Sequence, residues 1–174
     1  MKKNLTLLTT AAMMAALTCI ATMMIRVPTV GTNGYVNIGD TIVLLSAWML
    51  GNPYGALAAG IGSGLADLLA GYGAYVPGTT VIKFAMAFVG FLVFKGFGKM
   101  KLPSVVGYCV SGVVAEAIMV LGYFLYESTI LGYGLVALSA IPGNMIQGIT
   151  CLVLGVPLVL ILKKVPQLRM LATE

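Results

Sequence analysis

The feature that most constrains this chain is a series of apolar runs, several of them long enough to cross a membrane. Residues 4–25 and 135–162 contain no charged side chain. A helix needs about 20 apolar residues to cross the hydrocarbon core of a bilayer. The runs are continuous, unlike the short alternating segments of a membrane β-barrel. Charged residues make up 9% of the chain, against about a quarter in a soluble domain. The sequence therefore predicts an all-α integral membrane protein that forms one domain over residues 1–174.

Loops and turns divide the chain into six predicted transmembrane helices. They cover residues 1–25, 39–50, 54–69, 77–97, 104–126 and 135–162. The first run could be a signal peptide, but it is longer than the apolar part of a usual one, so we interpret it as a span. The second run is too short to cross alone. It can serve as a span only if the loop before it, residues 26–38, enters the protein, where irregular backbone is tolerated.

The basic residues predict how these helices are oriented. With the amino terminus in the cytoplasm, the outer loops hold only Arg26, and Lys83 lies within a span. The inner segments then hold Lys2, Lys3, Lys95, Lys99, Lys101, Lys163, Lys164 and Arg169. Cytoplasmic loops of membrane proteins are enriched in lysine and arginine. We therefore expect six spans with both termini in the cytoplasm, in a multi-pass protein of a cell membrane.

Ionisable side chains inside the spans are candidates for a functional site, because they are costly in lipid. Residues 37–83 contain Asp40, Asp67 and Lys83 within otherwise apolar and glycine-rich sequence. Lys83 could extend to the membrane surface, pair with Asp67 or contact a ligand. We interpret Asp40 as the cap of the second helix. Asp40 and Asp67 are thus predicted to be structural or gating residues.

Further polar residues converge with these on the predicted outer side of the bundle. Glu116 has no lysine in its own helix, so it must pair across helices, be protonated or meet a ligand. Asn144 and Gln147 share a helical face and suit the edge of a heterocycle, while several tyrosines could stack on a planar ring. The predicted ligand-binding residues are Asn33, Tyr35, Asn37, Tyr72, Tyr75, Thr79, Lys83, Glu116, Tyr123, Asn144 and Gln147.

No enzymatic or metal-binding pattern is visible in the sequence. The chain contains no histidine, and its three cysteines, Cys19, Cys109 and Cys151, lack metal-ligand spacing. A phosphate-binding loop is also absent, so the chain cannot drive transport by hydrolysing a nucleotide. We expect neither an enzyme nor a cofactor, and no nucleic-acid partner, because the basic residues lie at span ends.

Small residues recur along the first predicted span. Ala11 and Ala15, and likewise Ala12 and Ala16, stand four residues apart. Such spacing allows another helix to approach closely. The face could pack within the protein or bind a partner.

Four motifs, taken in order, resemble a known family. They are Asn37-Ile-Gly-Asp40, Gly60-Ile-Gly-Ser-Gly-Leu-Ala-Asp67, Tyr75-Val-Pro-Gly-Thr79 with Lys83, and Ile141-Pro-Gly-Asn144 with Gln147. Together with the six-span layout, they resemble the S components of energy-coupling factor (ECF) vitamin transporters. The resemblance is strongest to the branch that includes riboflavin, hydroxymethylpyrimidine and vitamin B6 S components.

The resemblance implies a six-helix subunit of a prokaryotic plasma membrane that binds a vitamin from outside with high affinity. It also implies partners, namely a transmembrane scaffold protein and two cytoplasmic ATPases, and a subunit that topples in the membrane to release its vitamin. In the family an alanine-rich face of the first helix docks the scaffold, a role that Ala11, Ala12, Ala15 and Ala16 match. Residues 26–38 and 71–76 match loops that gate the pocket.

The identity of the vitamin is an expectation from the same analogy. The chain has a single tryptophan, which favours vitamin B6 or hydroxymethylpyrimidine, then riboflavin, over thiamine. Two alternatives stay open: an autonomous small secondary carrier, and a membrane scaffold protein that transports nothing.

Overall fold

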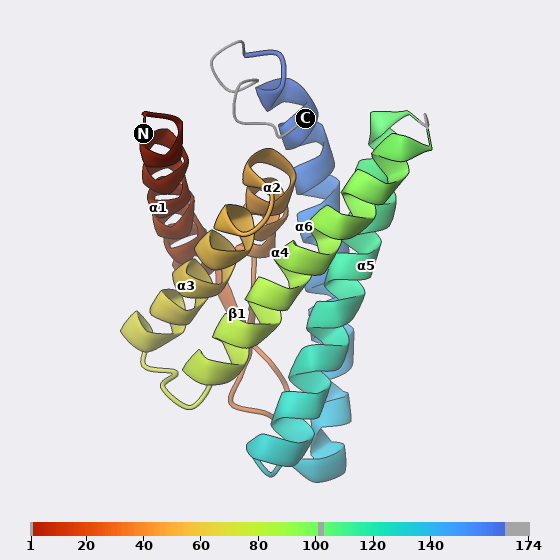
Figure 1. Ribbon diagram of the computed structural model, residues 1–174. Helices are drawn as coiled ribbons and strands as arrows, with labels where there is room; N and C mark the ends of the chain where they lie inside the picture. Colours follow the sequence, from red (N-terminus) through yellow and green to blue (C-terminus); the bar gives the residue numbers. More distant parts are fainter. Residues whose placement is uncertain (1, 101–102, 166–174) are drawn as a thin grey trace.

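The computed structural model describes residues 2–100 and 103–165, with only the backbone for residues 2–4. The described residues form one helical bundle, in which the start of α1 and the end of α6 lie at the same end (Figure 1). Its helices are α1 (Lys2–Met24), α2 (Asp40–Leu50), α3 (Tyr54–Leu69), α4 (Val76–Lys99), α5 (Ser104–Leu125) and α6 (Ile141–Leu162). An antiparallel hairpin, β1 (Arg26–Pro28) and β2 (Tyr35–Asn37), precedes α2.

Helix α2 lies at the centre of the bundle. It contacts the other five α-helices, and ten of its eleven residues are buried. Its length is about 16 Å at 1.5 Å per residue, about half of a bilayer's hydrocarbon core. The β1–β2 hairpin lies among the helices just before it (Figure 1). Strand β1 is exposed and β2 is half-buried, and the Asn37 backbone contacts Gln147 of α6, so the part of the loop next to α2 packs within the bundle.

Four helical segments are long and apolar enough to cross a membrane. They are Leu5–Met24, Val76–Lys99, Ser104–Ile130 and Gly134–Leu162, while α2 and α3 are shorter apolar helices. Helix α3 has the predicted bounds, and Pro142 stands in the first turn of α6, so it starts that helix.

Two predicted loops were wrong in part. Helix α4 continues to Lys99, two residues beyond its predicted end, so Lys99 is helical and does not belong to the loop. After α5 the chain forms a π-helical turn, Tyr126–Ile130, where a loop was expected, and a 3-10 helix, Gly134–Ala140, then leads to α6. Lys101 and Arg169, which the orientation argument used, lie outside the described residues.

The glycines of α3 explain how closely its neighbours pack. A Cβ atom added at Gly62 would meet the carbonyl oxygen of Ala15 in α1, and one added at Gly60 would lie 2.7 Å from the Thr80 carbonyl oxygen in α4. Neither position has room for a side chain. Two helices therefore approach the α3 backbone from different sides, as small residues permit in membrane bundles.

Candidate ligand-binding site

Polar side chains from β2, α3, α4, α5 and α6 surround a small space, which we call the chamber. It lies between the end of α3, the start of α4, the end of α5 and the start of α6, away from the ends of the chain (Figure 1). Predicted residues that line it are Tyr35, Asn37, Asp67, Tyr75, Thr79, Lys83, Tyr123 and Asn144. The free volume between them is about 20 Å³, enough for about one water molecule.

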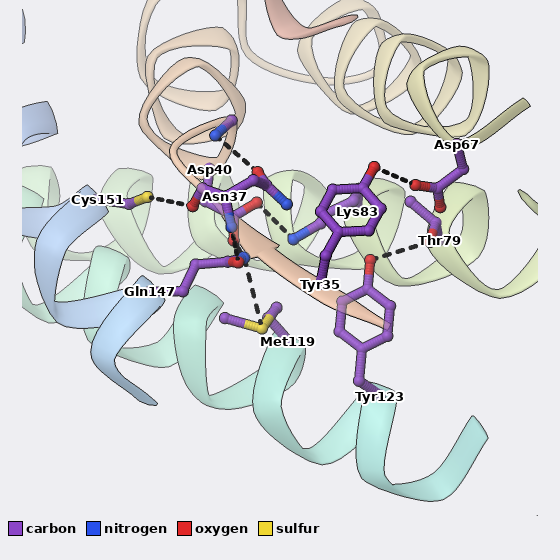
Figure 2. A network of polar contacts seen from close by, with 11 residues as sticks. Tyr35, Asn37, Asp40, Asp67, Thr79, Lys83, Met119, Tyr123, Gln147 and Cys151 are labelled. Atoms are coloured by element: carbon purple, nitrogen blue, oxygen red, sulfur yellow. Dashed lines mark hydrogen bonds and ion pairs between the residues drawn. The ribbon is translucent and has the colours of Figure 1, made fainter. Parts of the chain in front are cut away.

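One lining residue of the chamber, Lys83, belongs to a buried ion pair. The Lys83 ammonium nitrogen lies 2.5 Å from the Asp40 Oδ1 atom, and the two residues are 2% and 0% exposed. The Gln147 amide donates to Asp40 Oδ2 at 2.5 Å, and Gln147 Oε1 accepts the Asn37 backbone N–H at 2.6 Å. Figure 2 shows this chain of contacts. It joins β2, α2, α4 and α6, and gives both buried charges the partners that they need.

Two of the three alternatives for Lys83 are wrong. Its side chain is buried and does not extend to the membrane surface, and its ion-pair partner is Asp40, not Asp67. The capping role of Asp40 is also wrong. Gly39 holds the N-cap position of α2 without a side-chain cap, and Asn37 Oδ1 accepts the Gly39 N–H at 2.8 Å. The carboxylate of Asp40 neutralises Lys83 instead.

Two hydrogen bonds from tyrosines to carboxyl groups cross the chamber; we call these the tyrosine–carboxyl pairs. The Tyr35 hydroxyl donates to Asp67 Oδ1 at 2.5 Å (Figure 2), and the Tyr75 hydroxyl donates to Glu127 Oε1 at 2.9 Å. Burial, and then the adjacent carboxylate, raise the pKa of both tyrosines. The hydroxyls therefore keep their protons at physiological pH and donate these two hydrogen bonds.

A wider cavity, the vestibule, adjoins the chamber. Its free volume is about 580 Å³, and it is lined by Asn33 and Tyr72 from the predicted set. Gly34 and Tyr75 line both cavities, so they mark the boundary. The rings of Tyr35 and Tyr72 lie 4.6 Å apart between centroids. Tyr35, Tyr72 and Tyr75 thus lie where the two cavities meet.

Gly34 brings the hairpin against one tyrosine–carboxyl pair. A Cβ atom there would lie 3.1 Å from Glu127 Oε1 and 3.2 Å from the Tyr75 hydroxyl. These distances are tighter than ordinary contact, so a larger residue would push the hairpin away from that pair.

Two of the predicted ligand-binding residues line neither the chamber nor the vestibule. Gln147 stands behind the chamber, bonded to Asp40 and Asn37. Glu116 is buried between α5 and α6 beside Gly148, and lines a separate groove of about 180 Å³. Neither of its carboxyl oxygens has a hydrogen-bond partner among the described residues.

Sequence reasoning missed five residues of the chamber lining, among them a carboxyl group. They are Thr22, Thr29, Gly34, Ser63 and Glu127. Glu127 was assigned to a loop, yet it is 2% exposed. It follows Tyr123 by four residues, so both share a face once the helix continues through the π-helical turn. That spacing was the signal that could have identified it.

The alanines of α1 do not form a single outward face. Ala11 is buried against Leu50 and Ala58, and Ala15 is half-buried where α1 meets Gly62. Ala12 and Ala16 are exposed. Half of the predicted docking face is therefore used for packing within the bundle.

The sequence was also compared with known protein families. A family model described as “ECF-type riboflavin transporter, S component” matches residues 2–164. The chain belongs to this family. The resemblance identified in the sequence is thereby confirmed. As an S component, the chain belongs to a family of vitamin-binding transporter subunits, not of enzymes, and its four long apolar helices fit a multi-pass membrane protein.

Two further proteins are similar to this S component. A protein of Pyrococcus woesei described as “Uncharacterized protein in gap 3'region” is 33% identical over 148 residues, which are 83% of this chain and 93% of that protein. A solved structure described as “Structure and mechanism of the S component of a bacterial ECF transporter” has a TM-score of 0.67 and 18% identity. The similarity covers 92% of this chain and 97% of the other. At that identity the similarity shows a shared fold.

Proposed function

We propose that this protein captures a small heteroaromatic vitamin outside a prokaryotic plasma membrane and delivers it to an ECF importer. The observation that carries this is the chamber with its adjoining vestibule, where tyrosine rings, an amide and a buried lysine face one space. A ligand site of this kind combines apolar or aromatic walls with a few placed polar groups. Asn144 supports the proposal, since it is buried and lines the chamber, where its amide can pair with the edge of a heterocycle.

Vitamin B6 or hydroxymethylpyrimidine is the favoured ligand, and riboflavin is next. In support, the aromatic residues of the chamber are Tyr35, Tyr75 and Tyr123, while Trp48 is buried in the core, where its indole N–H donates to Ser111. A pocket for a small ligand usually has about 300–1,000 Å³. A vitamin therefore enters the chamber from the vestibule by displacing the tyrosine–carboxyl pairs, so residues 26–38 and 71–76 act as gates.

In this proposal, the energy for releasing the vitamin into the cell comes from partner proteins. A transmembrane scaffold protein and two cytoplasmic ATPases bind the S component, and Ala12 and Ala16 offer an exposed small-residue face for the scaffold. Six crossings with both termini in the cytoplasm agree with the distribution of lysine and arginine.

Native mass spectrometry of protein purified from vitamin-replete cells tests this function. We expect one bound vitamin per chain. A chain that carries no small molecule and binds none when vitamins are added would favour a membrane scaffold protein. Vitamin uptake by vesicles that contain this chain alone would instead favour a secondary carrier.

A further inference from the structure

We propose that the chamber binds the unphosphorylated form of its vitamin and rejects the phosphate ester, with Glu127 as the residue that determines this specificity. The inference rests on the proposed function, vitamin binding, and adds the chemical form of the ligand.

The charges around the chamber are the first argument. Asp67 and Glu127 supply two carboxyl groups, and Lys83 is the only lysine or arginine among the described lining residues. Lys83 is already paired with Asp40 at 2.5 Å. Arg26 lies 5.9 Å from the Tyr35 ring but is exposed and does not line the chamber. Among the described lining residues, an anion that enters therefore meets two carboxyl groups and no free cation.

The hydrogen-bonding capacity of Glu127 is the second argument. Its Oε1 atom accepts the Tyr75 hydroxyl, while its Oε2 atom is buried and makes no hydrogen bond of good geometry to the described residues, although the Thr32 hydroxyl lies near the carboxyl group. A buried acceptor without a partner is costly. A hydroxyl, amine or ring N–H on the ligand would satisfy it. A phosphate dianion offers only further acceptors.

The position of Glu127 is the third argument. Its partner Tyr75 lines both the vestibule and the chamber, so the carboxyl group stands near the boundary between the two cavities. A phosphate attached to the ring would have to pass Glu127 or remain beside it. Juxtaposed like charges at a desolvated site cost several kcal/mol. We therefore expect the phosphate ester to bind about 100-fold more weakly than the free vitamin.

Binding measurements on the purified full chain test the inference. The probes are three matched pairs: pyridoxal and pyridoxal 5'-phosphate, hydroxymethylpyrimidine and its monophosphate, and riboflavin and riboflavin 5'-phosphate. We expect one free vitamin to bind and its ester to bind about 100-fold more weakly. An ester that binds within about threefold of its vitamin overturns the inference but leaves the proposed function standing. Binding of none of the six overturns the proposed function, and the inference with it.

Two variants of near-identical shape separate charge from hydrogen bonding. Glu127→Gln removes the charge, and we expect it to reduce the discrimination about tenfold. Tyr75→Phe removes the hydrogen bond to Glu127 but keeps the charge, and we expect discrimination to persist even where both ligands bind more weakly. Full discrimination in Glu127→Gln, or an equal loss in Tyr75→Phe, would overturn the role of Glu127. If a variant does not fold, the ratio of the affinities for the free vitamin and its phosphate ester in the unaltered protein still tests whether the ester is rejected.

Discussion

At the scale of single residues, the Asp40–Lys83 pair links the ligand chamber to the core of the fold. Asp40 lies on the central helix α2, and Lys83 lines the chamber from α4. Substituting one partner leaves the other charge buried without a counter-ion, which typically costs about 3–5 kcal/mol. We expect Lys83→Met to lower the free energy of unfolding by about this amount, as measured by denaturation of the purified protein in detergent.

The double variant Asp40→Asn with Lys83→Met is the matched control. It removes both charges, and an asparagine at this position can still accept the Gln147 amide hydrogen bond. We expect it to be more stable than Lys83→Met alone. If the two substitutions instead destabilise additively, the pair is not the source of the loss.

Residue types could be predicted from this sequence far better than their partners. Asp40, Asp67 and Lys83 are conspicuous because charges are rare inside spans. Their pairing, however, depends on which helices touch. Lys83 pairs with Asp40 across 43 residues, and Asp67 accepts from Tyr35 across 32. The periodicity of a sequence shows which residues share a helical face, but not which other helix packs against that face. The pairing of Lys83 with Asp67, which is nearer to it in sequence than Asp40, was therefore a reasonable but wrong alternative.

At the scale of elements, helix α1 has an inward and an outward row of alanines. Ala11 and Ala15 pack toward Leu50, Ala58 and Gly62, and Ala12 and Ala16 are exposed. We expect Ala16→Trp to abolish co-purification with the scaffold protein while ligand affinity remains, because a bulky side chain prevents close helix approach. Co-purification from a membrane extract, together with a binding isotherm, measures both properties.

Two controls make this experiment specific to the face. Leu121→Trp places the same bulk on α5, at a residue that is 61% exposed, and should leave the complex intact. Ala15→Trp should instead lower the yield of folded protein, because its site faces Gly62. Retention of the scaffold by Ala16→Trp would remove α1 from the docking surface.

The α-helices were predictable as elements, whereas the two short strands and the π-helical turn were not. Helix α3 follows the turn at Pro53, and α4 begins with Pro77 in its first turn, so both starts carry a sequence signal. Strands β1 and β2 have three residues each, too few to show alternation. No residue pattern distinguishes the π-helical turn that contains Glu127 from a loop. The buried carboxyl group of Glu127 was therefore assigned to a loop.

At the scale of the whole molecule, the predicted orientation can be tested by labelling. Cysteines introduced as Asn33→Cys and Lys99→Cys, after replacement of the three native cysteines, report on opposite ends of the bundle; both positions are exposed. We expect a membrane-impermeant maleimide to label Asn33→Cys in intact cells and Lys99→Cys only after lysis. The reverse pattern would place the chamber on the cytoplasmic side and contradict uptake from outside.

The central helix also constrains the order in which the protein can be assembled during synthesis. Helix α2 is too short to cross a bilayer and carries Asp40 near its start, so alone it has no stable place in lipid. Its counter-ion, Lys83, is made 43 residues later. Residues 26–50 therefore cannot take up their final buried position until α4 has been translated. The ion pair beside the chamber is then also a contact that forms late in the assembly of the bundle.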